Sequence, residues 1–492
     1  MGHSIMILFA IFFPILWGLF LLIKPDFKER KSLVLTTGIG LVITVCFSLA
    51  VIFSGDMKLL LFSVGENMDI FFRVDGVGRI FAAIVTLIWP LAGIYAFEYM
   101  SHYEENKRYF GFYMMVFGVL LALTFSGSIL TFYLFYEMMT LFSMPLVFHF
   151  RSKEAIMAGL KYLFYSLCGA YFVLFGIYFL NKYASTLHFV AGGALDMTVV
   201  EGNKGLLLVV ALCMILGFGV KAGMFPMHAW LPTAHPIAPA PASAVMSSLI
   251  VKMGILGMLR VVYFIFGADF LRGTWVQTTW LVLTLLTVFM GSMLAYREKV
   301  LKKRLAYSTV SQLSYILFGM ALLQTQALTG ALLHVVFHAT IKAALFMSAG
   351  AIIHKTHKTN VDELRGIGKE MPITLWCFTA CACALIGFPP ASGFISKWYL
   401  ATGALQSGMD VFAWLGPVVL LVSALLTAGY LLPISVNGFL PGADYDYQSL
   451  KKQEPSKVMV VPIIILATIA VLLGVFPNPL IEAVTAIVSS VL

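Results

Sequence analysis

Apolar runs long enough to cross a lipid bilayer recur from one end of the sequence to the other. A helix of about 20 apolar residues spans the hydrocarbon core, and segments inside a bilayer must satisfy their backbone hydrogen bonds internally. Only 11% of the residues are charged, whereas soluble domains contain about 25%. The sequence therefore predicts an all-α integral membrane protein and excludes a soluble globular one.

We assign fourteen transmembrane helices to these runs. Their approximate ranges are 4–23, 33–54, 77–100, 109–126, 128–150, 155–181, 204–224, 241–267, 274–295, 304–323, 327–353, 372–403, 411–437 and 456–480. Between the second and the third, the segment KLLLFSVGENMDIFFRVD has the strand-like composition and the turn residues of a β-hairpin. We expect this hairpin to lie on one membrane face.

Lysine and arginine side chains gather in the loops on one side of the predicted bundle. If the N-terminus is placed outside, the inside loops hold most of them: Lys24, Lys28, Arg30, Lys31, Lys107, Arg108, Arg151, Lys153, Arg297, Lys299, Lys302, Lys303, Arg304, Lys355, Lys358, Arg365, Lys369, Lys451, Lys452 and Lys457. The positive-inside rule assigns such loops to the cytoplasm. We therefore expect a multi-pass protein of the plasma (cytoplasmic) membrane with both termini outside. The net charge of +9 reflects this bias, and no basic patch indicates a nucleic-acid partner.

Prolines interrupt two of the predicted spans. The stretch 218–252, FGVKAGMFPMHAWLPTAHPIAPAPASAVMSSLIVK, contains five prolines between Lys221 and Lys252. The stretch 387–393, GFPPASG, interrupts the twelfth span, and Lys397 follows it. Proline removes a backbone donor and clashes with the preceding turn. Freed backbone groups and lysines at membrane depth persist only where protein buries them or water reaches them, so both breaks are expected to line an ion or substrate path.

The two breaks also predict an internal repeat. Five spans separate them, so residues 109–267 and residues 274–437 each form a five-helix unit with one interrupted helix, helix 7 or helix 12. Because five is odd, the second unit is inverted relative to the first, as in many transporters. Residues 1–108 then form a three-helix segment with an external hairpin, and residues 438–492 form a cytoplasmic loop and a C-terminal helix.

A buried lysine can take up and release a proton, since loss of water favours the neutral amine and a nearby carboxylate favours the ammonium form. Glu137, in FYLFYEMMTLFSMP, is the one acidic residue placed deep within a predicted span. We expect Glu137 to pair with Lys221, which would hold its proton while the pair is closed and release it when the pair opens. A static ion pair that locks two helices is the alternative.

The other lysines are assigned by their depth. Lys252 lies about 10 residues into the eighth span, too deep to snorkel to the interface, and we assign it a relay role. Lys397 is assigned as the terminal proton donor or acceptor, with an interfacial lysine as the alternative. Lys161 and Arg260 are nearer the ends of their spans, where snorkelling is expected.

Histidines extend the predicted path. His334, His338 and Lys342 recur every four residues and share one helical face. Histidine relays protons near neutral pH, so a proton path is favoured over simple interhelical hydrogen bonding. A metal site is not expected, because HVVFH lacks the glutamate of the protease motif and a third ligand. His228 and His235, in the proline-rich stretch, could line a cytoplasmic entrance or pack within an ordered loop.

No cofactor site is visible in the sequence. The six cysteines show no CxxC spacing, and no nucleotide-binding motif occurs. The many Phe and Met residues are more simply lipid-facing and packing surface than a quinone site. We therefore expect the chain to bind no cofactor and no metal of its own.

Three segments carry a resemblance to a known family. MFPMHAWLPTAHPIAPAPASAVMSSLIVKMGILGMLR, FHATIKAALFMSAGAIIHKT and LIGFPPASGFISKWYLA resemble the antiporter-like subunits of complex I, of membrane-bound hydrogenases and of Mrp cation/proton antiporters. The resemblance implies fourteen helices, two inverted five-helix units with broken helices 7 and 12, and proton translocation along a central polar axis. It implies these roles: Glu137 and Lys221 as coupling pair, Lys252 as central relay, His334 and His338 as axis residues, and Lys397 as outlet.

Family members work in assemblies, so the resemblance implies other integral membrane subunits as partners, homologous antiporter-like subunits among them, with any iron–sulfur centres on peripheral subunits. The leading hypothesis is a proton-pumping subunit, or a sodium-pumping one, of a redox-driven complex of the hydrogenase or complex I type. The alternative is a subunit of an Mrp-type Na⁺/H⁺ antiporter without redox chemistry. A third hypothesis, a non-transporting structural subunit, treats the buried lysines as packing residues.

Overall fold

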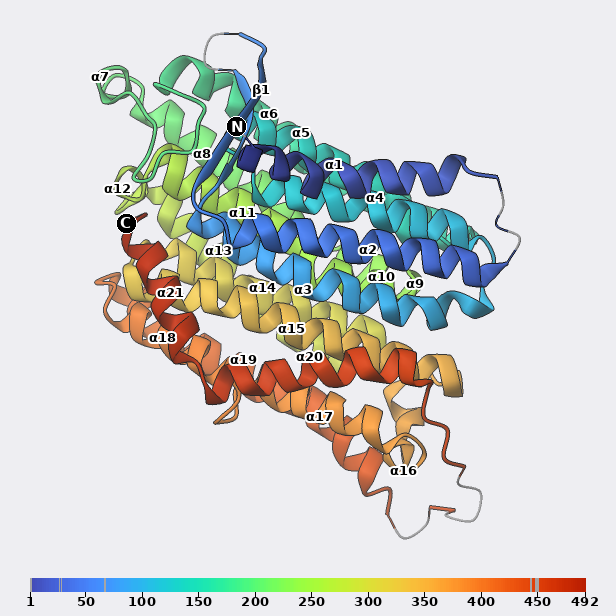
Figure 1. Ribbon diagram of the computed structural model, residues 1–492. Helices are drawn as coiled ribbons and strands as arrows, with labels where there is room; N and C mark the ends of the chain where they lie inside the picture. The colour runs from blue at the N-terminus through green and yellow to red at the C-terminus, as the bar shows by residue number, and fades with distance from the viewer. Residues whose placement is uncertain (1, 26, 28, 66–67, 443–444, 447–450) are drawn as a thin grey trace.

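The structure is a computed structural model that describes residues 2–25, 27, 29–65, 68–442, 445–446 and 451–492. Its helices run side by side in one bundle (Figure 1). Among the described residues, eleven helices are long and apolar enough to cross a membrane. They are α1 (Gly2–Ile23), α2 (Arg30–Ile52), α3 (Gly76–Tyr99), α5 (Ile129–Val147), α6 (Lys153–Tyr183), α8 (Lys204–Lys221), α13 (Trp275–Arg297), α15 (Thr325–Thr356), α19 (Asp410–Phe439), α20 (Lys457–Val475) and a compound helix over Ala240–Phe266. The chain is thus a multi-pass, all-α membrane protein.

The compound helix is not regular along its length. It consists of α10 (Ala240–Val245), a π-helical segment η2 (Met246–Ile250), α11 (Val251–Arg260) and a second π-helical segment η3 (Val261–Phe266). π-Helical turns leave some backbone carbonyls without their usual partner and are frequent at functional sites. Lys252, the second residue of α11, lies two residues after the end of the first of these segments.

The remaining helices are shorter or less apolar. The longest are α4 (Asn106–Thr124), α14 (Leu301–Ala321), α17 (Pro372–Ile386) and α18 (Ser392–Leu405). The short ones are α7 (Met197–Val200), α9 (Leu231–Ile237), α12 (Ala268–Leu271), α16 (Ile367–Glu370) and α21 (Asn478–Ser489). Two 3₁₀ turns, η1 (Met100–His102) and η4 (Val361–Leu364), complete them. Basic residues in the first turn of α4 and of α14 reduce the hydropathy of these two helices.

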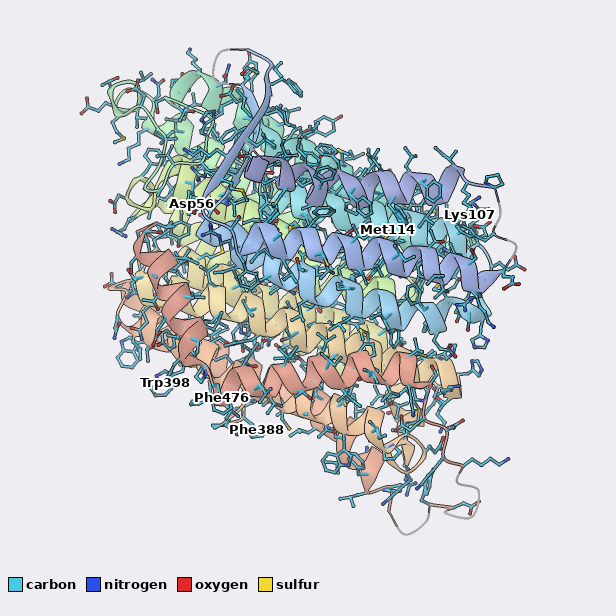
Figure 2. All side chains as sticks on the ribbon, in the orientation of Figure 1. Asp56, Lys107, Met114, Phe388, Trp398 and Phe476 are labelled. Atoms are coloured by element: carbon cyan, nitrogen blue, oxygen red, sulfur yellow. The ribbon has the colours of Figure 1, made fainter. Side chains whose placement is uncertain are left out.

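The expected β-hairpin is present. Strands β1 (Met57–Ser63) and β2 (Asp69–Val74) pair antiparallel, with Met57 opposite Val74 and an irregularity between Leu60 and Phe62. Residues 66 and 67 of the predicted turn lie outside the described residues. The hairpin lies at the end of the bundle where α1 begins and α21 ends (Figure 1). In Figure 2, Asp56 marks this end and Lys107 marks the opposite one.

Both expected helix breaks occur where the prolines predict them. α8 ends at Lys221, and the short α9 and then α10 follow after an irregular stretch, 222–230. α17 ends at Ile386, and α18 begins at Ser392. Gly387 has a φ of +99°, in the left-handed region that glycine tolerates. Each break leaves carbonyls at a helix end without a helical partner.

The centre of the bundle is formed by the compound helix and α15. We compare the most apolar 18-residue stretch of each helix. All residues of this stretch are buried in the compound helix and 94% in α15, but only 33% in α1 and 28% in α19. α15 packs against α14, α17, α18 and α20. Polar side chains on these two central helices are therefore shielded from lipid by the surrounding helices.

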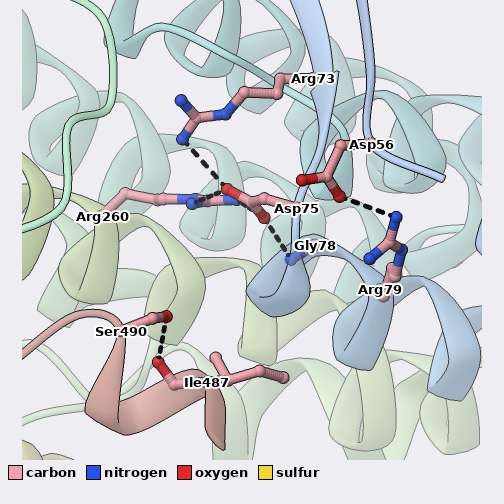
Figure 3. Close-up of polar contacts among 8 residues, drawn as sticks. All are labelled: Asp56, Arg73, Asp75, Gly78, Arg79, Arg260, Ile487 and Ser490. Carbon is pink, nitrogen blue, oxygen red and sulfur yellow. Dashed lines mark hydrogen bonds and ion pairs between the residues drawn. The ribbon is translucent and has the colours of Figure 1, made fainter.

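The C-terminal region differs from the expected single helix. After α20, Pro477 interrupts the chain, and the separate helix α21 follows. α21 lies against the start of α3, where the side chain of Ile487 fills the space beside Gly76 (Figure 3). α21 has only 12 residues. It was not predicted because our assignment used only apolar runs long enough to span a bilayer.

Arg260 does not snorkel to the interface, contrary to the sequence prediction. Its side chain is 1% exposed and donates two hydrogen bonds to Asp75, of 2.6 and 2.7 Å (Figure 3). Asp75 also caps α3 by accepting from the backbone N–H of Gly78. Burial raises the pKa of Asp75, but the charge and hydrogen bonds of Arg260 outweigh it and hold the pKa at about 2. The pair thus contributes stability above about pH 4, which is lost as the pH falls towards 2.

We predict that Asp75→Ala lowers the free energy of unfolding by about 3–5 kcal/mol, because it leaves the buried Arg260 guanidinium without the carboxylate that binds it. The double variant Asp75→Ala/Arg260→Met is expected to regain part of this loss. Denaturant titration in detergent micelles measures both. The control is Asp56→Ala, since Asp56 is 83% exposed in its pair with Arg79 and its loss should cost about 0–1 kcal/mol. Equal losses in Asp75→Ala and Asp56→Ala would contradict the assignment.

Candidate functional site

Lys221, the last residue of α8, is fully buried and surrounded by hydroxyl groups. Its Nζ donates to Thr140 Oγ1 at 2.9 Å, to Tyr162 OH at 2.8 Å and to Ser166 Oγ at 2.7 Å. The acceptors come from α5 and α6, so the lysine joins three helices. An ammonium group has three donors, and all three are satisfied here.

The direct ion pair that we predicted between Glu137 and Lys221 is not formed in this structure. No carboxylate of the described residues lies within ion-pair distance of Lys221, because the three hydroxyls occupy its donors. Glu137 lies half-buried on α5, one turn before Thr140, and its Oε1 has no hydrogen-bond partner within the described ranges. The two charges are still close enough to interact electrostatically. Whether they form the coupling pair stays a prediction.

Lys252 is fully buried and lies beside α8. Its Nζ donates to the carbonyl of Ser247 at 2.6 Å and shares a hydrogen bond of 2.8 Å with Nδ1 of His338, in which an ammonium Nζ is the donor. The first acceptor belongs to the π-helical segment η2. α11 and α8 pack closely, since a Cβ at Gly254 would lie 2.9 Å from the Cβ of Lys221. The sequence correctly placed Lys252 at depth, and the structure brings it to His338.

The two histidines of α15 continue from Lys252. The rings of His338 and His334 stack with centroids 5.8 Å apart. His334 is bonded through Nδ1 to Ser396 Oγ at 2.8 Å and through Nε2 to Gln312 Oε1 at 3.1 Å. Nε2 of His338 has no partner among the described residues. When Lys252 is an ammonium group it can only donate to Nδ1, and the proton of a neutral His338 ring then lies on this unpaired Nε2.

Lys397 lies one residue beyond Ser396, at the second helix break. Its Nζ donates to the carbonyls of Leu385 at 2.6 Å and of Ile386 at 2.8 Å. These carbonyls end α17, where the backbone lacks helical partners and carries partial negative charge. The ring of Tyr315 lies 5.2 Å from Nζ on the other side. The break thus creates the acceptors that hold this lysine.

Near the proline-rich stretch a second set of basic groups is buried. Lys342 donates to the Leu305 carbonyl at 3.0 Å and to Ser308 Oγ. His235 stacks on Phe346 at 4.9 Å, and neither of its ring nitrogens has a hydrogen-bond partner in the part of the chain that the structure describes. The charge of Lys342 acts on both His235 and Lys252. These groups therefore lie beside the row formed by Lys252, His338 and His334.

Lys302 was missed by the sequence analysis, which placed it in a cytoplasmic loop. It is 6% exposed and donates to the carbonyls of Pro236 at 3.0 Å and Ala238 at 2.5 Å. The sequence feature that could have predicted the burial of Lys302 is its position two residues before the apolar helix predicted over 304–323. His228 is half-buried, stacks on Phe225 at 6.1 Å and lies near the charge of Lys161.

We call the row formed by Lys221, Lys252, His338, His334 and Lys397 the basic axis. Its members come from α8, α11, α15 and α18, which include the two most buried elements of the bundle. Sequence reasoning found these residues but not the neutral groups that bind them, because Ser, Thr, Tyr and Gln are common in membrane helices. The fold and the axis together define a polytopic membrane protein with titratable groups at membrane depth, the arrangement found in ion-translocating proteins.

Comparison with known proteins agrees with this class. The family model for the transmembrane region of NADH:quinone oxidoreductase and Mrp antiporters matches residues 126–427. A model for the N-terminus of chain 5 of NADH-ubiquinone oxidoreductase (complex I) matches residues 61–110. The chain belongs to this family of complex I and Mrp antiporter subunits, as its three motifs indicated.

Individual relatives come from several assemblies. Subunit N of the NADH-quinone oxidoreductase of Desulforudis audaxviator is 32% identical over 82% of this chain and 81% of its own length. Hydrogenase-4 component B of Escherichia coli K12 is 31% identical over 83% of this chain, which spans only 63% of that protein. A chain of the Mrp complex from a Dietzia species superposes with a TM-score of 0.85 at 22% identity, over 100% of this chain and 98% of that one. This structural likeness shows the fold.

We predict a coupling of about 1.5–3 kcal/mol between Tyr162 and Lys221 in a double-mutant cycle of Tyr162→Phe and Lys221→Met, because the phenol accepts a hydrogen bond from a charged group. The measurement is the free energy of unfolding in detergent. Tyr171→Phe is the matched control, since Tyr171 lies on the same helix and is 67% exposed. A Tyr162→Phe loss that is unchanged in the Lys221→Met background would contradict the contact.

Proposed function

We propose that this chain is a proton-translocating subunit of a multi-subunit, redox-driven membrane complex of the membrane-bound hydrogenase or complex I type. The single observation that carries the proposal is the direct contact of Lys252 with His338, continued by His334, inside the two most buried elements. Ionisable side chains at this depth are expensive and are usually functional. Sodium is the alternative ion, and Glu137 is a carboxylate whose charge acts on Lys221.

The geometry of the axis suits proton transfer. The Nζ of Lys252 and Nδ1 of His338 are 2.8 Å apart, within the range of about 2.6–3.2 Å at which a proton passes between heavy atoms. A proton that reaches Nδ1 leaves the one on Nε2 free to move on, because a ring that is protonated on both nitrogens can release either proton. His334 is in turn hydrogen-bonded to Ser396, which precedes Lys397 in the chain.

The role of Glu137 in this proposal is to change the charge state of Lys221. In the present arrangement Lys221 is held by hydroxyls and makes no direct hydrogen bond with Glu137. If Glu137 approaches, the ammonium of Lys221 is stabilised; if it withdraws, a proton moves towards Lys252 on the neighbouring α11. His228, His235 and Lys342 are proposed as accessory groups on the route from the cytoplasm.

We further propose fourteen membrane crossings. The eleven long apolar helices are joined in this count by α4, by α14 and by the interrupted pair α17–α18. Residues 109–267 and residues 274–437 then form the two inverted five-helix units, flanked by residues 1–108 and 438–492. An even number of crossings returns the chain to the side of the membrane on which it starts. This agrees with Figure 1, in which α1 starts and α21 ends at the same end of the bundle. The distribution of basic residues supports a plasma-membrane protein with both termini outside.

The partners that we propose are other integral membrane subunits, including homologous antiporter-like ones, with iron–sulfur centres on peripheral subunits. NADH-quinone oxidoreductase and hydrogenase relatives at 32% and 31% identity favour the redox-driven assembly. The second candidate, an Mrp-type Na⁺/H⁺ antiporter subunit without redox chemistry, is favoured by the similarity to a chain of the Mrp complex over its whole length.

We predict that Lys252→Met reduces proton translocation by at least about tenfold while the complex still assembles, because the residue that donates to His338 is lost. Translocation is measured in inverted membrane vesicles with a fluorescent pH probe. Lys182→Met is the control, since Lys182 is exposed at the end of α6. Normal translocation in both Lys252→Met and Lys221→Met would instead support a structural subunit.

We predict that the complex, isolated gently with its native partners, contains iron and acid-labile sulfide. Both are measured chemically against the protein content of the complex. Abundant iron–sulfur identifies the chain as the ion-translocating part of a redox complex. A complex free of iron that still exchanges cations for protons would overturn this prediction in favour of the Mrp-type antiporter.

A further inference from the structure

A pocket of about 360 Å³ opens beside Lys397, on the outer surface of the bundle. It lies between α18 and α19 at the end of α17, and its walls are apolar apart from Lys397. Phe394, Trp398 and Leu421 form its outer rim and are 38%, 58% and 64% exposed. Figure 2 shows Trp398 at the outer edge of the bundle. The volume is within the range of about 300–1,000 Å³ of small-molecule sites.

Lys397 has no counter-ion in the part of the chain that the structure describes. Two of its three donors bind the neutral carbonyls of Leu385 and Ile386, and the ring of Tyr315 lies behind it. No described carboxylate forms an ion pair with it. One donor of the ammonium therefore remains for a further acceptor, and an anion there would supply the missing charge.

The depth of Lys397 decides which anions can reach it. α17 has 15 residues and α18 has 14, so at about 1.5 Å per residue each is roughly 20 Å long. The break between them falls inside a hydrocarbon core of about 30 Å. The phosphate of a phospholipid stays at the membrane surface. A single carboxyl group on an acyl chain can enter from the lipid in its neutral, protonated form and pass its proton to the neutral amine of Lys397, which leaves a carboxylate beside an ammonium group.

We propose that this pocket binds a long-chain fatty acid from the membrane. Its carboxylate accepts from the Nζ of Lys397, and its acyl chain lies along Trp398 and Leu421 in the groove between α18 and α19. The carboxylate neutralises the lysine, and the apolar walls receive the chain. Binding at this site does not require the ion transport of the proposed function, so the two can fail separately.

The test uses the full-length protein with its native partners, in nanodiscs of phosphatidylcholine, with Trp398 as the reporter. 9,10-Dibromostearic acid is titrated into the sample. The Trp398 signal is the difference in fluorescence between the wild type and the Trp398→Phe variant. We expect saturable quenching by the acid, and quenching by its methyl ester only at concentrations about tenfold higher or more, because the ester has no charge to pair with Lys397.

Two variants isolate the two parts of the site. Lys397→Gln can still donate to the carbonyls of α17 but carries no charge, and we expect it to abolish the preference for the acid over the ester. Ala424→Phe keeps the lysine but fills the pocket, and we expect it to remove saturable quenching. Lys182→Gln, at the exposed end of α6, is the control for a lysine elsewhere on the surface and should behave as the wild type.

Equal quenching by the acid and the ester would overturn the proposal, as would a preference for the acid that survives Lys397→Gln. Brominated phosphatidylcholine is used as a third quencher, to test whether lipid reaches Trp398. If neither it nor the acid quenches Trp398 in the assembled complex, a neighbouring protein subunit covers this face, and the fatty-acid site is excluded.

Discussion

Buried lysines in a lipid bilayer are the constraint on which this structure depends. Each ammonium group must find acceptors inside the protein, because lipid offers none. Lys221 finds three hydroxyls from α5 and α6, Lys252 finds a carbonyl and an imidazole, and Lys397 finds two carbonyls. These contacts fix how α5, α6, α8, α11 and α15 pack at the centre. The apolar outer helices, such as α1 and α19, then exclude lipid from them.

Irregular backbone supplies many of these acceptors. The end of α17 provides the two carbonyls for Lys397, and the π-helical segment before α11 provides one for Lys252. The end of α9 provides two more for Lys302. A regular helix would use the same carbonyls in its own hydrogen bonds. Irregular backbone therefore helps to hold Lys397, Lys302 and Lys252 at this depth, whereas Lys221 depends on side-chain hydroxyls.

The sequence predicted the helices because hydropathy reports length and apolarity directly. It also placed the lysines of the axis, since a charge within an apolar run is easy to see. It could not predict the acceptors, because Thr140, Tyr162 and Gln312 are common residue types whose partners depend on packing. For the same reason it assigned Arg260 to the interface: its partner Asp75 is distant in sequence and lies just before α3. The short helix α21 escaped because it is too short to span a membrane.

The neutral character of the acceptors has a consequence for proton movement. A carboxylate partner stabilises only the protonated lysine, so a static ion pair would hold the proton in place. Carbonyl and hydroxyl oxygens accept hydrogen bonds from an amine as well as from an ammonium group. The two carbonyls that bind Lys397 match the two N–H bonds of a neutral amine, so both of its contacts survive loss of the proton. In the described part of the chain, none of the three axis lysines is paired with a carboxylate, whereas Arg260 is. The structure thus contains two kinds of buried cation. Arg260 is held in its charged form by Asp75 at one end of the bundle. The axis lysines at the centre have neutral acceptors and can lose a proton while the helices stay packed.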